Sequence, residues 1–223
     1  MKKLNFIIKY GLALLLLSFY SCESWLNVTP SDRLSEEMLF NDREGFVKAL
    51  NGVYIELNTN ELYGRNLTAG ALDVMGQYYS VASSSHAFYN YGGLVYTGND
   101  EKALFDNMWQ KCYAVIACCN TIIEKCDENK AGLSPVWKGS IKGEALALRA
   151  MLHFDMLRLF GPLTSELDKE SIPYQTNSDQ TVTPLLSGSE VIGLILDDLK
   201  NAVGLLKDTD PYFVEEEFSD TDL

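Results

Sequence analysis

The most continuous helical pattern of apolar residues in this chain lies between Gly143 and Gly161. Apolar side chains occupy nearly every face of the predicted helix, and the polar residues that interrupt them are Glu144, Arg149, His153, Asp155 and Arg158. A helix that is apolar nearly all round is buried on several sides. Gly161 can adopt the left-handed conformation that ends a helix, and Pro162 cannot continue one. We therefore expect a central core helix here, with the other elements packed around it.

Three further segments carry apolar residues at helical spacing. The first begins at Asn41, which has a glutamate three residues further on as in a capping box, and its apolar stripe runs to Leu57. The second covers 102–127. The third begins with a capping-box pattern at Ser187 and continues to about Lys207.

Long loops connect these helices. Glycine, asparagine and serine break the pattern over 58–99, where we expect one short helix at about 67–79, and 162–184 is a polar crossing segment without clear periodicity. No pair of alternating strands with a hairpin signal is recognisable, so the predicted fold class is all-α with long loops. The helices over 102–127 and 136–160 are joined by a short connector, which favours the antiparallel pairing of a tetratricopeptide-like scaffold. A strict repeat of about 34 residues is absent.

The N-terminus has the pattern of a secretory signal. Lys2, Lys3 and Lys9 precede a leucine-rich run that is shorter than the roughly 20 apolar residues of a membrane span. Ser21 directly precedes Cys22, as in bacterial lipoprotein signals, so we predict a signal peptide over 1–21 and lipidation of Cys22. The alternative is ordinary secretion with an incidental cysteine. We assign 22–40 to a lipidated tether and 41–223 to the helical domain.

Charge and cysteine usage exclude some functions. Removing residues 1–21 takes away three lysines and no acids, so the formal charge changes from −13 to −16. Such an acidic chain argues against nucleic-acid partners. Cys112, Cys119 and Cys126 are spaced by seven, hence about 10 Å apart on a helix, beyond the roughly 7 Å that a disulfide allows. We interpret them as buried thiols and, without a CxxC or paired histidines, predict no metal and no cofactor.

The order of these features resembles the SusD/RagB family of nutrient-binding outer-membrane lipoproteins of the Bacteroidetes. Each matching segment is weakly specific alone, and their order and spacing together are specific. The segments are CESWLNVTPSD at 22–32, FVKALNGVY at 46–54, WQKCYAVIACCNTII at 109–123, GEALALRAMLHFDMLRLFGP at 143–162, Ile172-Pro173, and DDLKNA at 197–202.

The resemblance implies a lipid-anchored protein on the extracellular face of the outer membrane. It implies pairing with a SusC-type TonB-dependent β-barrel, to which the lipoprotein delivers an oligosaccharide or other polymer fragment for import. RagB-type members suggest a peptide as an alternative ligand. Family members are considerably longer, and this chain matches their N-terminal half, so we expect the 41–223 domain to be incomplete at its C-terminus.

The best candidate for ligand contact is the aromatic-rich loop over 76–100. Sugar binding uses aromatic faces for stacking and amides or carboxylates for the hydroxyl groups. Tyr89 and Tyr91, on either side of Asn90, are the preferred residues. The predicted ligand-binding set is Tyr78, Tyr79, Phe88, Tyr89, Asn90, Tyr91 and Asn99.

The sequence gives weaker evidence for catalytic residues than for a binding loop. Arg149 and His153 are four residues apart on the central helix, and we interpret Arg149 as a buried structural residue that binds carbonyls or a carboxylate. The acid pair Asp197 and Asp198 points in two directions on a helix and does not form a glycosidase dyad. We predict no enzyme activity. The alternatives are a helical adaptor lipoprotein that binds only protein and, less favoured, a lipoprotein glycoside hydrolase.

Overall fold

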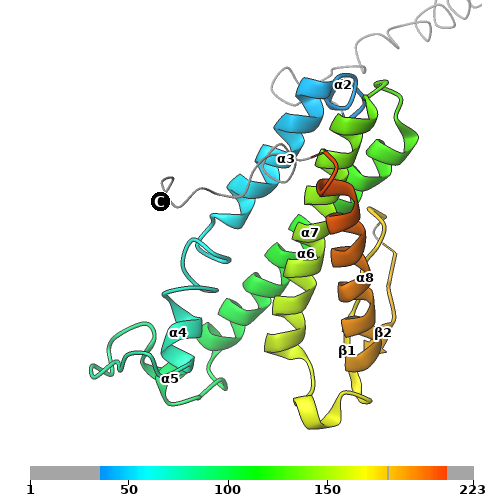
Figure 1. Ribbon diagram of the computed structural model, residues 1–223. Coiled ribbons are helices and arrows are strands. Elements are labelled where there is room, and N and C mark those ends of the chain that lie inside the picture. Colours follow the sequence, from blue (N-terminus) through cyan, green and yellow to red (C-terminus); the bar gives the residue numbers. More distant parts are fainter. Residues whose placement is uncertain (1–35, 180, 210–223) are drawn as a thin grey trace, which may run out of the picture. The chain divides into compact units, whose positions relative to one another are not determined.

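The structure is a computed structural model that describes residues 36–179 and 181–209 (Figure 1). The predicted signal peptide, Cys22 and most of the predicted tether lie outside the described residues. The chain divides into two compact units, 1–38 and 39–223. Residues 36–38 are the described part of the first unit, so the packing below concerns the second.

Helices dominate the described residues, which confirms the all-α prediction. The helices are α2 (Glu36–Leu39), α3 (Arg43–Leu57), α4 (Ala71–Met75), α5 (Tyr89–Gly92), α6 (Asn99–Glu128), α7 (Pro135–Phe160), the 3-10 turn η1 (Thr164–Glu166) and α8 (Gly188–Leu206). Within residues 36–179 and 181–209, none of these helices is both long and apolar enough to cross a bilayer.

The core is formed by helices packed side by side. Helix α7 packs against both α6 and α8, and α3 packs against α6 and α7 (Figure 1). Contacts such as Asn120 with Arg149 and Lys142 with Asp127 show that α6 and α7 run antiparallel. At Gly143 an added Cβ would lie 2.7 Å from Leu206 Cγ, so glycine permits the close approach of α7 and α8. Buried members of this core include Phe46, Met108, Ile116, Leu152, Met156 and Ile172.

Several predicted helix boundaries shift. Helix α3 begins at Arg43 with Asp42 as its N-cap, whose Oδ1 accepts a hydrogen bond from the Gly45 N–H at 2.8 Å, so the cap predicted at Asn41 was one residue early. The short helix predicted at 67–79 is confined to Ala71–Met75. At Ser187 the predicted capping box is confirmed, with both reciprocal hydrogen bonds present.

The central helix also differs from its prediction. Helix α7 begins already at Pro135, with Ser134 as N-cap, and the 30-residue α6 is longer still. Gly161 is extended, with φ −81° and ψ 175°, so the predicted left-handed cap was wrong, and the helix ends where Pro162 blocks continuation. Met151 and Phe154 are exposed, so α7 is not buried on every side.

Two short strands were missed. Strand β1 (Glu170–Pro173) pairs antiparallel with β2 (Leu185–Ser187), with Glu170 opposite Ser187 and Pro173 opposite Leu185. With four and three residues, the strands are too short to show an alternating pattern, and a long excursion rather than a hairpin turn separates them. Their pairing brings both ends of the crossing segment together beside α8.

Candidate functional site

The aromatic loop lies between α4 and the start of α6 and has its own small core. The ring of Tyr91, on the single turn α5, is 2% exposed. It packs edge-on against Phe88 and Phe105, with ring centroids 5.8 and 6.0 Å away, and its hydroxyl lies 3.5 Å from the Asp100 carbonyl oxygen. These contacts attach the loop to the first turns of α6.

Polar contacts fix the same loop. Asn90 Nδ2 donates to Oε1 of the buried Glu101 at 2.8 Å, and Gln77 Nε2 donates to the Gly92 carbonyl at 2.8 Å. A Cβ on Gly98 would lie 1.9 Å from Glu101 Oε2, so a side chain at position 98 would require the Glu101 carboxylate to move. The loop is therefore held at defined points and is not a free linker.

Exposed rings remain on this fixed frame. Tyr78 is 82% exposed, Tyr79 44% and Tyr89 43%, while Tyr96 is partly exposed and contacts Phe105 edge-on. A tyrosine ring that is held on a fixed frame offers an apolar face at low entropic cost, together with a hydroxyl for hydrogen bonding. Asn99, the first residue of α6, is also exposed and carries an amide.

The predicted ligand-binding residues differ in how far they are exposed. Tyr91, one of the two preferred residues, packs its ring into the small core under the loop and leaves little surface for a ligand. Phe88 is half-buried in the same core, with the Arg65 guanidinium 5.8 Å from its ring centroid. The Asn90 amide is already engaged by Glu101. Tyr78, Tyr79 and Tyr89 are the surface rings, with Asn99 as the polar neighbour in sequence.

A buried polar network occupies the middle of the helical core. Arg149 donates through Nε and Nη2 to the two carboxylate oxygens of Asp198, each at 2.7 Å, and through Nη1 to Asn120 Oδ1 at 2.8 Å. Burial alone would lower the pKa of Arg149, but the hydrogen bonds and charge of Asp198 outweigh it and raise that pKa. Both residues are buried, so the predicted structural role of Arg149 agrees with its contacts.

Asp198 as the partner was not foreseen, although the sequence contains a signal for it. Val191, Ile195, Asp198 and Ala202 follow one another at spacings of four, three and four, and all are buried on one face of α8. An acidic residue on an otherwise apolar helical stripe requires a buried partner. Its neighbour Asp197 is exposed and belongs to a surface pair with Lys200.

His153 links this network to the crossing segment. Its Nε2 accepts from the Gln175 N–H at 3.0 Å, which leaves Nδ1 as the protonated nitrogen that donates to the Arg149 carbonyl at 2.9 Å. The ring stacks on Tyr174 with centroids 3.9 Å apart, and Tyr174 donates to Asp198 Oδ2 at 2.6 Å. Burial lowers the pKa of His153 to about 4, so the imidazole is neutral at physiological pH.

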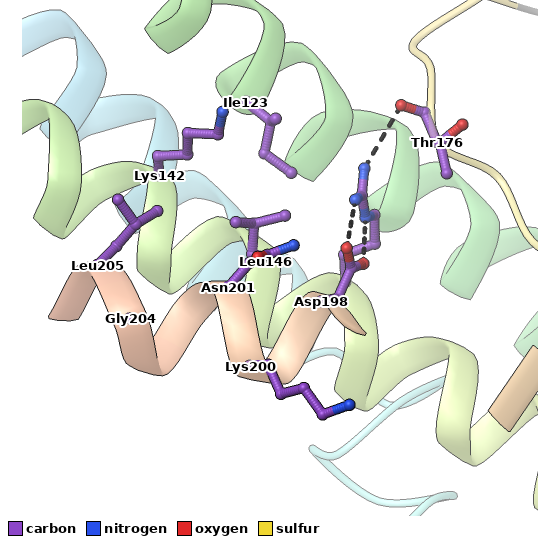
Figure 2. A pocket seen from close by; sticks show the side chains of 10 residues that line it. Ile123, Lys142, Leu146, Thr176, Asp198, Lys200, Asn201, Gly204 and Leu205 are labelled. Atoms are coloured by element: carbon purple, nitrogen blue, oxygen red, sulfur yellow. Dashed lines mark hydrogen bonds and ion pairs between the residues drawn. The ribbon is translucent and has the colours of Figure 1, made fainter. Parts of the chain in front are cut away.

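A hollow lies beside this network (Figure 2). Its volume is about 650 Å³, and its lining comes from α6, α7, α8 and the crossing segment at Thr176. The Arg149–Asp198 pair is part of this lining, and Lys142 is engaged by Asp127 at 2.6 Å. The hollow contains no aromatic ring, and its strongest charges neutralise each other. The remaining lining residues are Ile123, Leu146, Lys200, Asn201, Gly204 and Leu205.

Within 36–179 and 181–209, no three histidine, cysteine, aspartate or glutamate side chains gather in a way that would hold a metal ion. Cys112, Cys119 and Cys126 are buried free thiols, and burial raises the pKa of Cys119 and of Cys126 to about 12. Such thiols are packing residues and not reactive nucleophiles.

Comparison with known proteins identifies relatives. Residues 24–219 match the SusD-like family described as starch-binding and associating with the outer membrane. SusD-like protein P38 of Formosa agariphila is 27% identical over 199 residues, which are 82% of this chain and 34% of that protein. SusD-like protein P2 of the same organism is 26% identical over 166 residues, which are 72% of this chain and 30% of that protein.

A solved structure has the same fold. A SusD-like carbohydrate binding protein from Bacteroides vulgatus matches with a TM-score of 0.62 at 24% identity, over 79% of this chain and 38% of that one. The chain thus spans about a third of the length of these three relatives.

Proposed function

The chain belongs to the SusD-like family, and from this premise we propose that it is a glycan-binding lipoprotein of the outer membrane without catalytic activity. The observation that carries the proposal is the group of exposed tyrosines, Tyr78, Tyr79 and Tyr89, on a loop fixed to α6 by Asn90 and Tyr91. Stacking rings on a rigid support are the chemistry that sugar rings require. The name of the Bacteroides vulgatus relative as a carbohydrate binding protein supports the same ligand class.

The proposal extends to the route of the ligand. Lipidation at Cys22 would hold the protein at the outer membrane, on its extracellular face, after removal of 1–21. From there it would deliver glycan to a SusC-type TonB-dependent β-barrel for import. A pull-down from native outer membranes with an antibody against residues 23–223 tests this partner. Capture together with a large β-barrel supports delivery, and capture without one contradicts it.

The buried polar groups of the helical core support the proposed lack of catalytic activity. The buried carboxylate of Asp198 is neutralised by Arg149, and His153 has both ring nitrogens engaged by backbone groups. Neither presents a proton donor or acceptor to a substrate. The test is to incubate the purified protein with the glycan that it binds and to separate the mixture by chromatography. The length of the glycan should be unchanged.

Glycan binding itself is tested with residues 23–223 on an array of polysaccharides that includes starch, β-glucan, xylan, mannan and pectin. Replacing Tyr78, Tyr79 and Tyr89 together by alanine should weaken binding to the preferred polymer by more than tenfold, since each lost stacking contact contributes about 0.5–1.5 kcal/mol. Tyr54→Ala is the matched control, because Tyr54 is an exposed tyrosine on α3 outside the loop. Equal binding by the triple variant and the wild type would remove this loop from the site.

A further inference from the structure

A second aromatic surface lies at the other end of α6. A hollow of about 410 Å³ is lined by the start of α3, the connection between α6 and α7, and the first turn of α7. Trp137 is part of the lining and remains 41% exposed. Tryptophan is usually well buried because of its large apolar surface, so an exposed indole at the edge of a hollow indicates a surface for recognition.

Charged side chains surround this indole. The Arg43 guanidinium carbon lies 4.7 Å from the centroid of the Trp137 ring, and Asp42 and Glu44 line the same hollow. Asp42 uses Oδ1 to cap the Gly45 N–H, which leaves its second carboxylate oxygen for another partner. An apolar ring beside a stacked guanidinium and carboxylates combines the groups that bind the apolar face and the hydroxyls of a sugar.

The walls of the hollow are fixed by local hydrogen bonds. Asn129, in the left-handed conformation with φ 47°, exchanges two side-chain hydrogen bonds with the backbone of Leu133, at 2.7 and 3.2 Å. Ser134 caps α7 by accepting from the Trp137 N–H at 3.4 Å. A ligand therefore meets a surface that is already formed, which reduces the entropic cost of binding.

From these observations we propose that Trp137, with Arg43 and Asp42, forms a second glycan-binding site. This inference rests on the proposed function, because it assigns the same ligand class to a different surface. The tyrosine loop, which contains α5, is attached to the first turns of α6 (Figure 1). The hollow is lined by residues that follow the last residue of α6. A helix of 30 residues is about 45 Å long, so a short oligosaccharide occupies one site and a long polysaccharide can occupy both.

The test compares a polymer with its own heptasaccharide. The probe is the array polysaccharide that binds residues 23–223 most tightly, and affinities are measured for the wild type, Trp137→Ala and the triple tyrosine variant. Trp137→Ala should weaken polymer binding by tenfold or more through lost bivalency, and heptasaccharide binding by about two- to fivefold. Trp137→Tyr keeps a stacking ring and should restore most of the polymer affinity.

The controls separate this site from the loop and from the fold. Val136→Ala changes an exposed neighbour that does not line the hollow, and it should bind like the wild type. In protein labelled with 5-fluorotryptophan, the Trp137 resonance, identified by its loss in Trp137→Tyr, should shift on addition of the heptasaccharide. This readout concerns the site directly and does not depend on the stability of a variant.

Each outcome of these measurements supports or overturns the second site. Wild-type binding that Trp137→Ala leaves unchanged, with an unshifted Trp137 resonance, overturns the second site and leaves the proposed function intact. Absence of binding to every polysaccharide overturns both. Loss of binding in Trp137→Ala with normal binding in the triple tyrosine variant supports the site at Trp137 and removes the loop from glycan binding.

Discussion

Arg149 on α7 and Asp198 on α8 form a two-pronged ion pair, with both N–O distances 2.7 Å and both residues buried. Removing one partner leaves the other charge buried and uncompensated, which costs about 3–5 kcal/mol. Arg149→Leu should therefore lower the free energy of unfolding by that amount in urea titrations, while the protein that stays folded binds glycan normally. Normal stability with lost binding would instead place Arg149 in the ligand site.

A matched control lies on the same helix. Lys200 and Asp197 are a surface pair on α8, both largely exposed, and Lys200→Leu should change the free energy of unfolding by less than about 1 kcal/mol. The double variant Arg149→Leu with Asp198→Leu should be more stable than Arg149→Leu alone, because it removes the stranded carboxylate.

His153 makes the stability of the fold depend on pH. Its pKa is about 4 in the folded protein and 6.5 ordinarily, so between these values the unfolded chain binds more protons. The contribution of neutral His153 to the free energy of unfolding is fully present above about pH 6.5. It is lost as the pH decreases towards 4, and the loss is up to about 3 kcal/mol for a pKa difference of about 2.5. The titratable groups around the ring include Arg149, Asp198, Tyr174 and Tyr113.

The pH effect is measured by urea unfolding at several pH values from 7.5 to 4.5. His153→Gln removes the titrating group, so its stability curve should be flatter than that of the wild type over this window. His86→Gln is the control, since His86 is exposed in the loop. Parallel curves for the wild type and His153→Gln would contradict the assignment.

Tyr89 and Tyr91 should separate binding from stability. Tyr91→Ala removes a buried ring from the loop core and should lower the free energy of unfolding by about 2–4 kcal/mol, seen as a lower Tm. Tyr89→Ala removes an exposed ring and should leave the Tm within error of the wild type while weakening glycan binding about two- to tenfold. A reversed pattern would show that the loop packs differently.

The cysteines provide a rapid check of the helical packing. In residues 23–223 under native conditions, iodoacetamide should modify Cys118, which is exposed, and spare Cys112, Cys119 and Cys126, which are buried. Burial raises the thiol pKa of all four of these cysteines, Cys118 included, so the expected selectivity rests on access to the sulfur. Mass spectrometry identifies the labelled peptide, and Cys118→Ser should leave native protein unlabelled.

The helical scaffold was predictable because each long helix carries its own apolar stripe and end signals. Ser187 predicted its capping box correctly from local sequence alone. The strands β1 and β2 were not predictable, since three- and four-residue strands pair only because the crossing segment returns to α8. The extended conformation of Gly161 likewise depends on the chain after Pro162, which local patterns do not specify.

The candidate site was predictable as a region and only partly by residue. The aromatic content of the loop indicated ligand binding, but the sequence does not show which rings turn inward. Tyr91 turns inward because Phe105 of α6 packs against it, a contact between positions 14 apart. Trp137 belongs to no sequence motif. Its candidacy became visible only in the structure, where Arg43, which is far from it in sequence, lies over its ring.

The segment from Ser80 to Ala87 is mostly exposed, with local hydrogen bonds of Ser83, Ser85 and His86, and Val81 is its residue that packs against the loop core. Doubling the length of such a loop costs only about 0.6 kcal/mol. Insertions and substitutions there should be tolerated by the helices that carry the loop. In a chain that binds glycan as proposed, changes in this segment would alter the ligand surface without altering the helices, which makes it the natural place to graft a new specificity.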